Sequence, residues 1–374
     1  MKKVAAFLTA FTVFVIIAVA LHVTAVKVQP TENRDFGYWI SSAKDSSYEL
    51  LAKNIGEKTA LYMGSSEFHH GLKHSYNPSN LFRKTDLDLM CLGAAFNQSL
   101  THAITVGAVG PKLTNKKVCL ILSPTWFYKH RSKQAGREFL LRYSSTCFDK
   151  AMENDKLSAE TREAIKTRKE LLLGESGGKS DVKAISKALG KEKDIVKTSC
   201  MWIGNRGAEG TGHRGDGAKD EPVKLDFSSL REEVESYGTG EGFTNPYNME
   251  DRIFNRKFKI GLDGYKNKNA NLSFEESGEY GDLQIFLDVC KEQNLDVLLI
   301  LQPMNGKWYD YTGFTAEKRH VVSEKIGKIA ADSGVKLCDL TNEEYTEGFF
   351  EDAVHPSKKG WVIINEKAYD FFNS

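Results

Sequence analysis

The sequence predicts an α/β fold in which a mainly parallel sheet of five strands is doubly wound, with helices on both faces. Short apolar segments of strand character alternate along the chain with longer segments of helical periodicity, and this alternation is typical of parallel sheets. Residues 117–122 (KVCLIL) are apolar after the first position, which suits a strand that is buried on both faces.

The chain begins with a segment that predicts a single transmembrane helix, and we assign residues 1–27 to this anchor. Residues 4–26 contain no Asp, Glu, Lys or Arg, and a helix of that length can cross a hydrocarbon core of ~30 Å. Two lysines before the segment favour a cytoplasmic amino terminus. A cleaved signal peptide is the alternative, because Ala18-Val19-Ala20 has the small-x-small pattern of a cleavage site. Both interpretations place the body, residues 28–374, on the extracellular side.

The strands are predicted where β-branched and other apolar residues gather between turn signals. In chain order they are residues 58–63, 86–92, 117–122, 296–301 and 335–340. In the second, Leu87, Leu89 and Cys91 alternate with charged or apolar residues, whereas the third and fourth are continuous apolar runs.

The helices are predicted from apolar periodicity and from stop signals such as Gly110-Pro111, which closes an alanine-containing segment. In chain order they are residues 48–53, 97–109, two or three helices within 133–198, and then 246–265, 279–293, 315–333 and 357–372. Six glycines in residues 204–217 predict a flexible loop. Residues from about 130 to 275 therefore form a large helical and glycine-rich insertion between the third and fourth strands.

Composition excludes several classes of function. Hydrophobic content of 41% and charged content of 27% are those of a globular protein, and a net charge of +1 gives no basis for nucleic-acid binding. The six cysteines contain no Cys-x-x-Cys pair, which excludes a zinc ribbon and a dense disulfide framework. One disulfide is compatible with an extracellular compartment, but the sequence does not pair the cysteines.

Candidate catalytic residues are expected beyond the carboxyl ends of the strands, where open α/β sheets bind their ligands. The first strand leads into Gly64-Ser65-Ser66, and the loop before the last helix contains Asp352 and His355. Three residues apart, the carboxylate can hold one imidazole nitrogen while the other faces outward, as a serine nucleophile requires of its base. Alone, the pair is also explained by a turn cap and an ordinary loop histidine, but a serine at the end of the first strand favours catalysis.

Together these residues resemble the SGNH hydrolase superfamily, which has a flavodoxin-like sheet. The closer resemblance is to the DltD family, membrane-anchored proteins of D-alanyl-lipoteichoic acid synthesis in Gram-positive cells. The resemblance covers essentially the whole chain. Its signals are the amino-terminal anchor and residues 62–68 (YMGSSEF), 96–100 (FNQSL), 123–127 (SPTWF) and 352–356 (DAVHP).

The resemblance implies roles for individual residues. The superfamily's Gly-Asp-Ser motif falls on Gly64-Ser65-Ser66 and makes Ser66 the nucleophile, with His355 as base and Asp352 as acid. Ser65 lies closer to the strand and is the alternative nucleophile. The candidates for the oxyanion hole are the amides of Ser66 and Gly93 and the side chain of Asn97.

The sequence departs from the superfamily after the third strand, where Ser123-Pro124-Thr125-Trp126 replaces the usual Gly-x-Asn-Asp block. The oxyanion hole therefore lacks its asparagine by this pattern. Trp126, Trp308 and Tyr309 lie in loops at the sheet end and are interpreted as walls of an acceptor groove or, equally, as aromatics that pack on the insertion.

We predict no metal and no cofactor. His69, His70 and His74 follow the nucleophile, but no carboxylate or cysteine set completes a metal shell around them in the sequence. Residues 173–180 resemble a phosphate loop without its first glycine, and the glycines at 210, 212 and 215 stand in a loop rather than a strand–turn–helix. Glu67 is interpreted as a polarising group or as an acid at a helix start.

The resemblance implies a role in the D-alanylation of lipoteichoic acid at the outer face of the cytoplasmic membrane. As a mechanism, we hypothesise that Ser66 accepts the D-alanyl group as an ester, with His355 as general base and Asp352 orienting it. The implied partners are lipoteichoic acid, a multipass membrane O-acyltransferase (DltB), a D-alanyl carrier protein (DltC) and the membrane itself, without nucleic acid. Two alternatives stay open. One is a thioesterase or esterase whose acceptor is water, and the other is a non-catalytic scaffold that docks the carrier to the acyltransferase.

Overall fold

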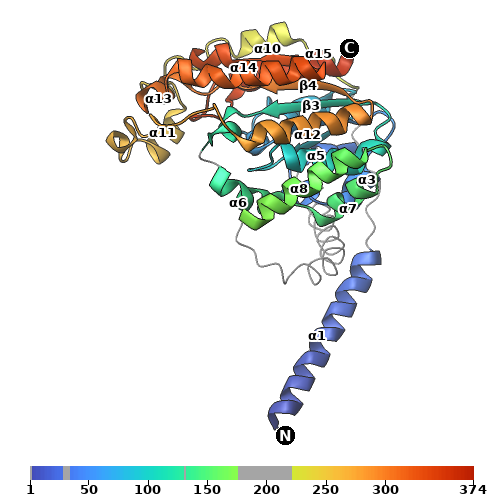
Figure 1. Cartoon of the computed structure of the whole chain (residues 1–374). Helices are drawn as coiled ribbons and strands as arrows, with labels where there is room; N and C mark the ends of the chain where they lie inside the picture. Colours follow the sequence, from blue (N-terminus) through green and yellow to red (C-terminus); the bar gives the residue numbers. More distant parts are fainter. Residues whose placement is uncertain (1, 28–33, 130–131, 176–220) are drawn as a thin grey trace.

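The computed structural model describes residues 2–27, 34–129, 132–175 and 221–374 (Figure 1). Its sheet has five parallel strands in the order β2-β1-β3-β4-β5, and this confirms the predicted fold class. The strands are β1 (Ala60–Gly64), β2 (Leu89–Gly93), β3 (Lys117–Leu122), β4 (Asp296–Leu301) and β5 (Lys336–Asp339). The strand order reverses direction between β1 and β3, and ligands of such sheets bind at the crevice that this reversal opens.

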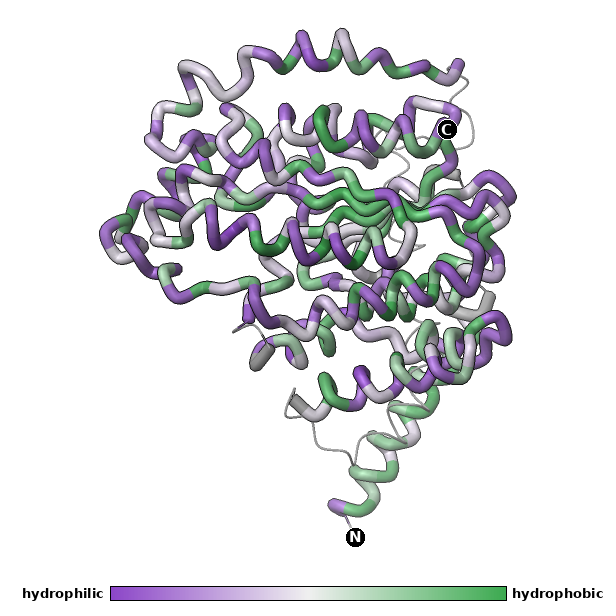
Figure 2. The backbone as a smooth tube through the Cα atoms, turned by 45° about the horizontal axis from the view of Figure 1, so that its top comes forward, coloured by the Kyte–Doolittle hydropathy of each residue, from purple (hydrophilic) through white to green (hydrophobic). Residues whose placement is uncertain are grey.

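Both faces of the sheet are covered, because every strand but the edge strand β5 is buried throughout its apolar length. Along β1, Leu61 and Met63 face one core cluster while Ala60 and Tyr62 face the other. Figure 2 shows these strands as an apolar centre inside a more hydrophilic exterior. Burial of alternate residues on opposite faces explains why the third and fourth strands read as continuous apolar runs.

The helices divide between the two faces. The first core cluster receives apolar residues of α5 (Ser99–Val109), α7 (Ser145–Glu153), α8 (Ala159–Glu175), α12 (Gly278–Glu292) and α14 (Ala316–Ser333). The second receives residues of α15 (Lys358–Asn373) and α10 (Phe227–Glu233). The other α-helices of the described α/β body are α2 (Ser42–Asp45), α3 (Tyr48–Lys53), α4 (Pro78–Leu81), α6 (Ser132–Arg142), α11 (Asp251–Lys257) and α13 (Gly306–Tyr311).

One predicted helix is two elements in the structure. Within residues 246–265 the structure has α11, which spans only Asp251–Lys257, and then a 3₁₀ turn, Leu262–Tyr265. Gly261, between them, has φ of 78°, a left-handed conformation that a right-handed helix cannot continue through. The predicted glycine-rich loop at 204–217, and the part of the helical stretch 133–198 beyond residue 175, lie outside the described residues.

The helix α1 (Lys2–Lys27) is a candidate membrane anchor. Among the described residues it is the one helix long and apolar enough to span a membrane, over Lys2–Thr24. Its side chains are exposed up to Thr24, and Figure 1 shows it projecting away from the α/β body. No packing against the body stabilises these apolar side chains, so a lipid environment is the one that suits them.

Candidate functional site

The two serines after β1 point in different directions. Ser66 opens a 3₁₀ turn, Ser66–His69, and its Oγ lies 2.9 Å from Nε2 of His355. The Ser65 hydroxyl instead donates to the carbonyl of Ala94 at 3.1 Å and is buried. The backbone of Ser65 is held by Glu67, whose carboxylate accepts from the Ser65 amide at 2.5 Å. The structure thus brings Ser66 to the histidine and turns Ser65 inward.

The loop before α15 supplies the acid and the base. Asp352 Oδ1 accepts from the backbone amides of Val354 and His355, each at 3.0 Å, and this turn fixes the carboxylate. The His355 ring then meets the same carboxylate through Nδ1, at 2.9 and 3.0 Å from its two oxygens. With Nδ1 donating to Asp352, Nε2 is left to accept a proton from Ser66.

Burial and charge set the proton affinities of this pair. Burial would raise the pKa of Asp352, but His355 and the two backbone amides hold it well below its usual range. Burial disfavours the charged imidazole of His355, yet the carboxylates of Asp352, Glu67 and Glu351 outweigh this and raise its pKa above the ordinary value. A histidine of raised pKa is a stronger proton acceptor once it is neutral.

A second pair, which the sequence did not reveal, lies behind the first. His70 stacks on His355 with ring centroids 3.5 Å apart and 8° between the planes, and its Nδ1 bonds to Glu351. One possible metal-ligand atom from each of His70, Glu351, Asp352 and His355 lies within 4.8 Å of the others. Folding therefore brings Glu351 and Asp352 close to His70, although the sequence around His70 contains no carboxylate set that predicts this. These atoms could hold a cation, but as they stand they bond to each other in two acid–base pairs.

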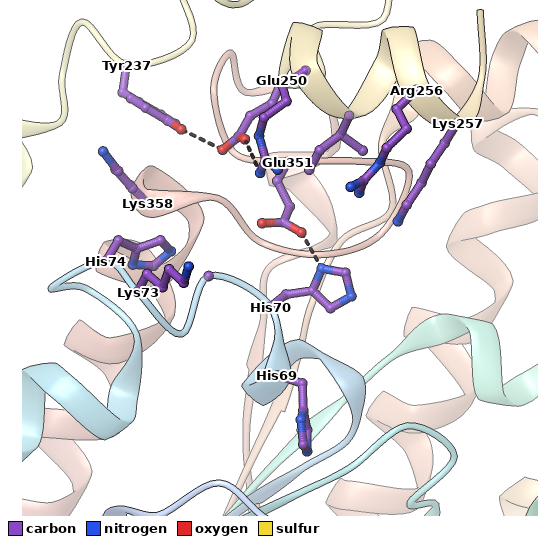
Figure 3. Close-up of a pocket in the computed structure, with 13 residues that line it drawn as sticks. His69, His70, Lys73, His74, Tyr237, Glu250, Arg256, Lys257, Glu351 and Lys358 are labelled. Carbon is purple, nitrogen blue, oxygen red and sulfur yellow. Dashed lines mark hydrogen bonds and ion pairs between the residues drawn. The ribbon is translucent and has the colours of Figure 1, made fainter. Parts of the chain in front are cut away.

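His70 and Glu351 line a cavity of about 450 Å³ (Figure 3). Its other walls come from the turn after Ser66–His69, from α11 and from the start of α15. Since the His70 ring stacks on His355, a ligand in this cavity lies one side chain away from the Ser66–His355 contact.

Comparison with known proteins places this geometry in a family. The family model described as DltD protein matches residues 35–373. The chain belongs to the DltD family. It is 26% identical over 328 residues to Protein DltD of Bacillus subtilis (strain 168), which covers 83% of this chain and 81% of that protein. It is 25% identical over 336 residues to Protein DltD of Staphylococcus aureus (strain NCTC 8325 / PS 47), covering 85% and 82%.

A third relative, Protein DltD of Lacticaseibacillus rhamnosus, is 23% identical over 341 residues, covering 86% of this chain and 79% of its own length. The match to the family confirms the resemblance predicted from the motifs. DltD proteins act in the D-alanylation of teichoic acids, so this DltD protein has a role in that process.

In this DltD protein the predicted oxyanion-hole residues are not all in one place. Gly93 ends β2 directly beside Gly64, its register partner on β1. The Asn97 amide donates to Asp45 at 3.4 Å, and within the described residues no hydrogen bond joins it to Ser66 or His355. After β3, Ser123 and Thr125 bond to each other through their hydroxyls at 2.9 Å, at the position where the superfamily has its asparagine.

The predicted groove aromatics of this DltD protein are buried and do not lie in loops, because Trp308 and Tyr309 are part of α13 and Trp126 is in a 3₁₀ turn, Pro124–Phe127. Trp126 and Trp308 are only 5% and 4% exposed, and Tyr309 is 7% exposed. The Trp308 ring packs on Tyr247 and Phe258, with centroids 5.1 and 4.8 Å away. For Trp308 these contacts favour packing on the insertion, whereas the rings next to Trp126 and Tyr309 are those of His102 and Phe314, outside the insertion.

Two further residues support the nucleophile turn, and one was missed by sequence. The His102 ring on α5 is buried, and burial lowers its pKa to about 4 although the backbone of Gly64 acts in the opposite direction, so the ring stays neutral beside the end of β1. A histidine in an apolar helix gave no signal of this contact. Glu67 is also buried, and this burial raises the pKa of its carboxyl group, although the hydrogen bonds from the Ser65 amide and from its own amide act to lower it.

Proposed function

We propose that this DltD protein transfers D-alanyl groups to lipoteichoic acid through an acyl-serine intermediate on Ser66. The observation that carries the proposal is the continuous chain of contacts from Ser66 Oγ to His355 and on to Asp352, at 2.9 Å for each step. A serine, a base and an orienting acid in this order are the parts that acyl transfer requires. Because the DltD family acts in D-alanylation, we take the transferred acyl group to be D-alanyl.

The first half-reaction forms the intermediate. Ser66 Oγ attacks the carbonyl carbon of an activated D-alanyl ester or thioester while His355 Nε2 takes the hydroxyl proton. The tetrahedral intermediate collapses, the bond to the donor's oxygen or sulfur breaks, and the donor leaves as an alcohol or thiol with the proton from His355. Asp352 stabilises the imidazolium throughout, since its carboxylate contacts Nδ1.

The second half-reaction passes the acyl group on. A glycerol hydroxyl of the polymer gives its proton to His355 and attacks the carbonyl carbon of the acyl-serine. The Ser66 ester bond breaks and Oγ recovers the proton from His355, so the enzyme returns to its starting state. The negative oxygen of both tetrahedral intermediates would face the amide of Ser66 and the amide of Gly93, which ends the adjacent strand.

The proposed reaction takes place at the outer face of the cytoplasmic membrane. This placement is supported by α1, an apolar helix long enough to span a membrane, and by the two lysines at its amino end. There the membrane O-acyltransferase DltB, fed by the carrier protein DltC, would supply the D-alanyl group, and lipoteichoic acid would receive it.

Hydrolysis is a second candidate, because Ser66 and His355 are only partly buried and water can reach an ester formed there. A trapped acyl-enzyme separates the two functions. Deacylation that is much faster with poly(glycerol phosphate) than with water alone supports transfer, and equal rates support an esterase.

The test in cells is the Ser66→Ala variant of the full-length protein, with Ser65→Ala as its matched control. Ser66→Ala should abolish D-alanyl ester on lipoteichoic acid while the protein remains folded and membrane-bound. Ser65→Ala should retain most of the ester, because its hydroxyl faces Ala94. Full esterification in the Ser66→Ala strain would overturn the mechanism and favour a scaffold.

A further inference from the structure

The cavity beside the nucleophile is lined by cations from three separate elements. Lys73 comes from the turn after Ser66–His69, Arg252, Arg256 and Lys257 come from α11, and Lys358 opens α15. In Figure 3 Lys358 lies on one side of Glu351, and Arg256 and Lys257 lie on the other. Positively charged side chains from segments far apart in the sequence thus line the same cavity.

The carboxylates in the cavity neutralise only part of this charge. Its two lining glutamates are already engaged, since Glu351 bonds to His70, and Glu250 accepts from Tyr237 at 2.7 Å and pairs with Arg252 at 3.7 Å. Lys257 contacts Asp352 at 3.5 Å.

Three cations remain without a carboxylate partner within the described part of the chain. Lys73 and Arg256 are exposed and form no ion pair there, and Lys358 lies over the Tyr237 ring at 5.5 Å. Cations that converge without acids to match them favour an anionic ligand.

We infer that this cavity binds phosphodiester groups of the acceptor polymer and thereby presents a glycerol hydroxyl to Ser66. The inference rests on the proposed function and adds the means by which the acceptor is recognised. A phosphodiester carries one negative charge and two free oxygens, which suit a guanidinium such as Arg256 and the point charge of a lysine ammonium. The volume of about 450 Å³ is that of a ligand-sized pocket.

The position of the cavity fits a polymer that continues past the reacting unit. His70 lines the cavity on one side and stacks on His355 on the other. A chain whose phosphate lies against Lys73 and Arg256 can therefore reach Ser66 with a neighbouring hydroxyl. Recognition by charge also predicts that salt weakens acceptor binding, because both cations are exposed to solvent.

The experiment compares two acceptors, free glycerol and oligo(glycerol phosphate), with full-length protein in detergent. The pocket variant is Lys73→Glu/Arg256→Glu. The matched control is Lys112→Glu/Lys291→Glu, two exposed lysines that precede β3 and β4 and so lie toward the amino ends of the strands, away from the carboxyl ends that carry the site. The pocket variant should lose preference for the phosphate acceptor by about tenfold, as two exposed ion pairs are worth. The control should keep the preference of the parent.

A binding measurement separates this inference from the proposed function. Oligo(glycerol phosphate) is titrated into the Ser66→Ala protein, which cannot acylate, with and without the pocket substitutions. Weaker binding on pocket substitution supports the cavity whatever the fate of the acyl group, and unchanged affinity overturns it. If the glutamate variant unfolds, Lys73→Gln/Arg256→Gln takes its place. Competition by phosphatidylglycerol vesicles as strong as by the oligomer, per phosphate, would assign the cavity to lipid headgroups and overturn the inference.

Discussion

Substitution of Asp352 by asparagine should disable the site while leaving the fold in place. Asp352 is 4% exposed, and its carboxylate accepts from the His355 ring and from two backbone amides. Asparagine has the same shape, and its carbonyl oxygen can still accept from the amides of Val354 and His355. What it cannot do is stabilise an imidazolium or hold the Nδ1–H tautomer of His355.

The expected loss of rate in Asp352→Asn follows from the distance between Asp352 and His355. With the two groups in hydrogen-bond contact at 2.9 Å, their charge centres lie about 4 Å apart, which gives about 4 kcal/mol at an effective dielectric constant of about 20. Each 1.4 kcal/mol is a factor of ten, so the charge alone is worth roughly 10³-fold in rate. The wrong tautomer adds to this, and the equivalent change in a serine-protease triad costs about 10⁴-fold.

The assay is single-turnover formation of the acyl-enzyme from a D-alanyl ester, measured against pH. Asp352→Asn should react about 10³- to 10⁴-fold more slowly, with thermal unfolding close to that of the parent. The control is Asp296→Asn, a half-exposed carboxylate at the amino end of β4. If a folded Asp352→Asn protein formed the acyl-enzyme at a rate within twofold of the parent's, this would refute the argument that Asp352 orients His355 and stabilises its imidazolium.

Three other substitutions test the surroundings. Glu67→Gln removes one of the carboxylates that raise the pKa of His355, so the acid limb of the kcat/KM profile, where His355 becomes neutral, should move to lower pH; an unmoved limb contradicts that coupling. His70→Ala should lower kcat about two- to tenfold by removing the ring stacked on His355, whereas His70→Phe should keep most of it; equal losses would show that the bond to Glu351 matters instead. Gly93→Ala should destabilise the protein by about 1–3 kcal/mol in denaturant unfolding, because its Cβ would lie 2.6 Å from the Phe68 ring; the control Gly327→Ala, with nothing within 4 Å, should not.

Local patterns made much of the fold predictable. The third and fourth strands have the bounds that their apolar runs predict, Lys117–Leu122 and Asp296–Leu301, because a strand buried on both faces has no polar alternation to blur its ends. The first strand begins at Ala60 rather than at residue 58, because the backbone amide of Thr59 donates to the carbonyl of Gly56 in a turn, at 3.3 Å, and is not available to the sheet.

The parts of the site that sequence missed are those made by tertiary contact. Asp352 and His355 stand three residues apart, so their bond is local and their spacing reveals it. His70 and Glu351 are 281 residues apart and meet only because the sheet brings the end of β1 beside the loop before α15. The burial of Trp308 by Tyr247 and Phe258 likewise depends on where the insertion folds back.

The most direct test is to identify the residue that carries the acyl group. Full-length protein is mixed with a D-alanyl ester, quenched in acid, digested and mapped by mass spectrometry. One D-alanyl group should be found on Ser66, and it should disappear from the Ser66→Ala protein and persist in Ser65→Ala. D-alanyl transfer that continues in the Ser66→Ala protein, or a D-alanyl group on Ser65 in the parent, would contradict the assignment of Ser66 as the nucleophile.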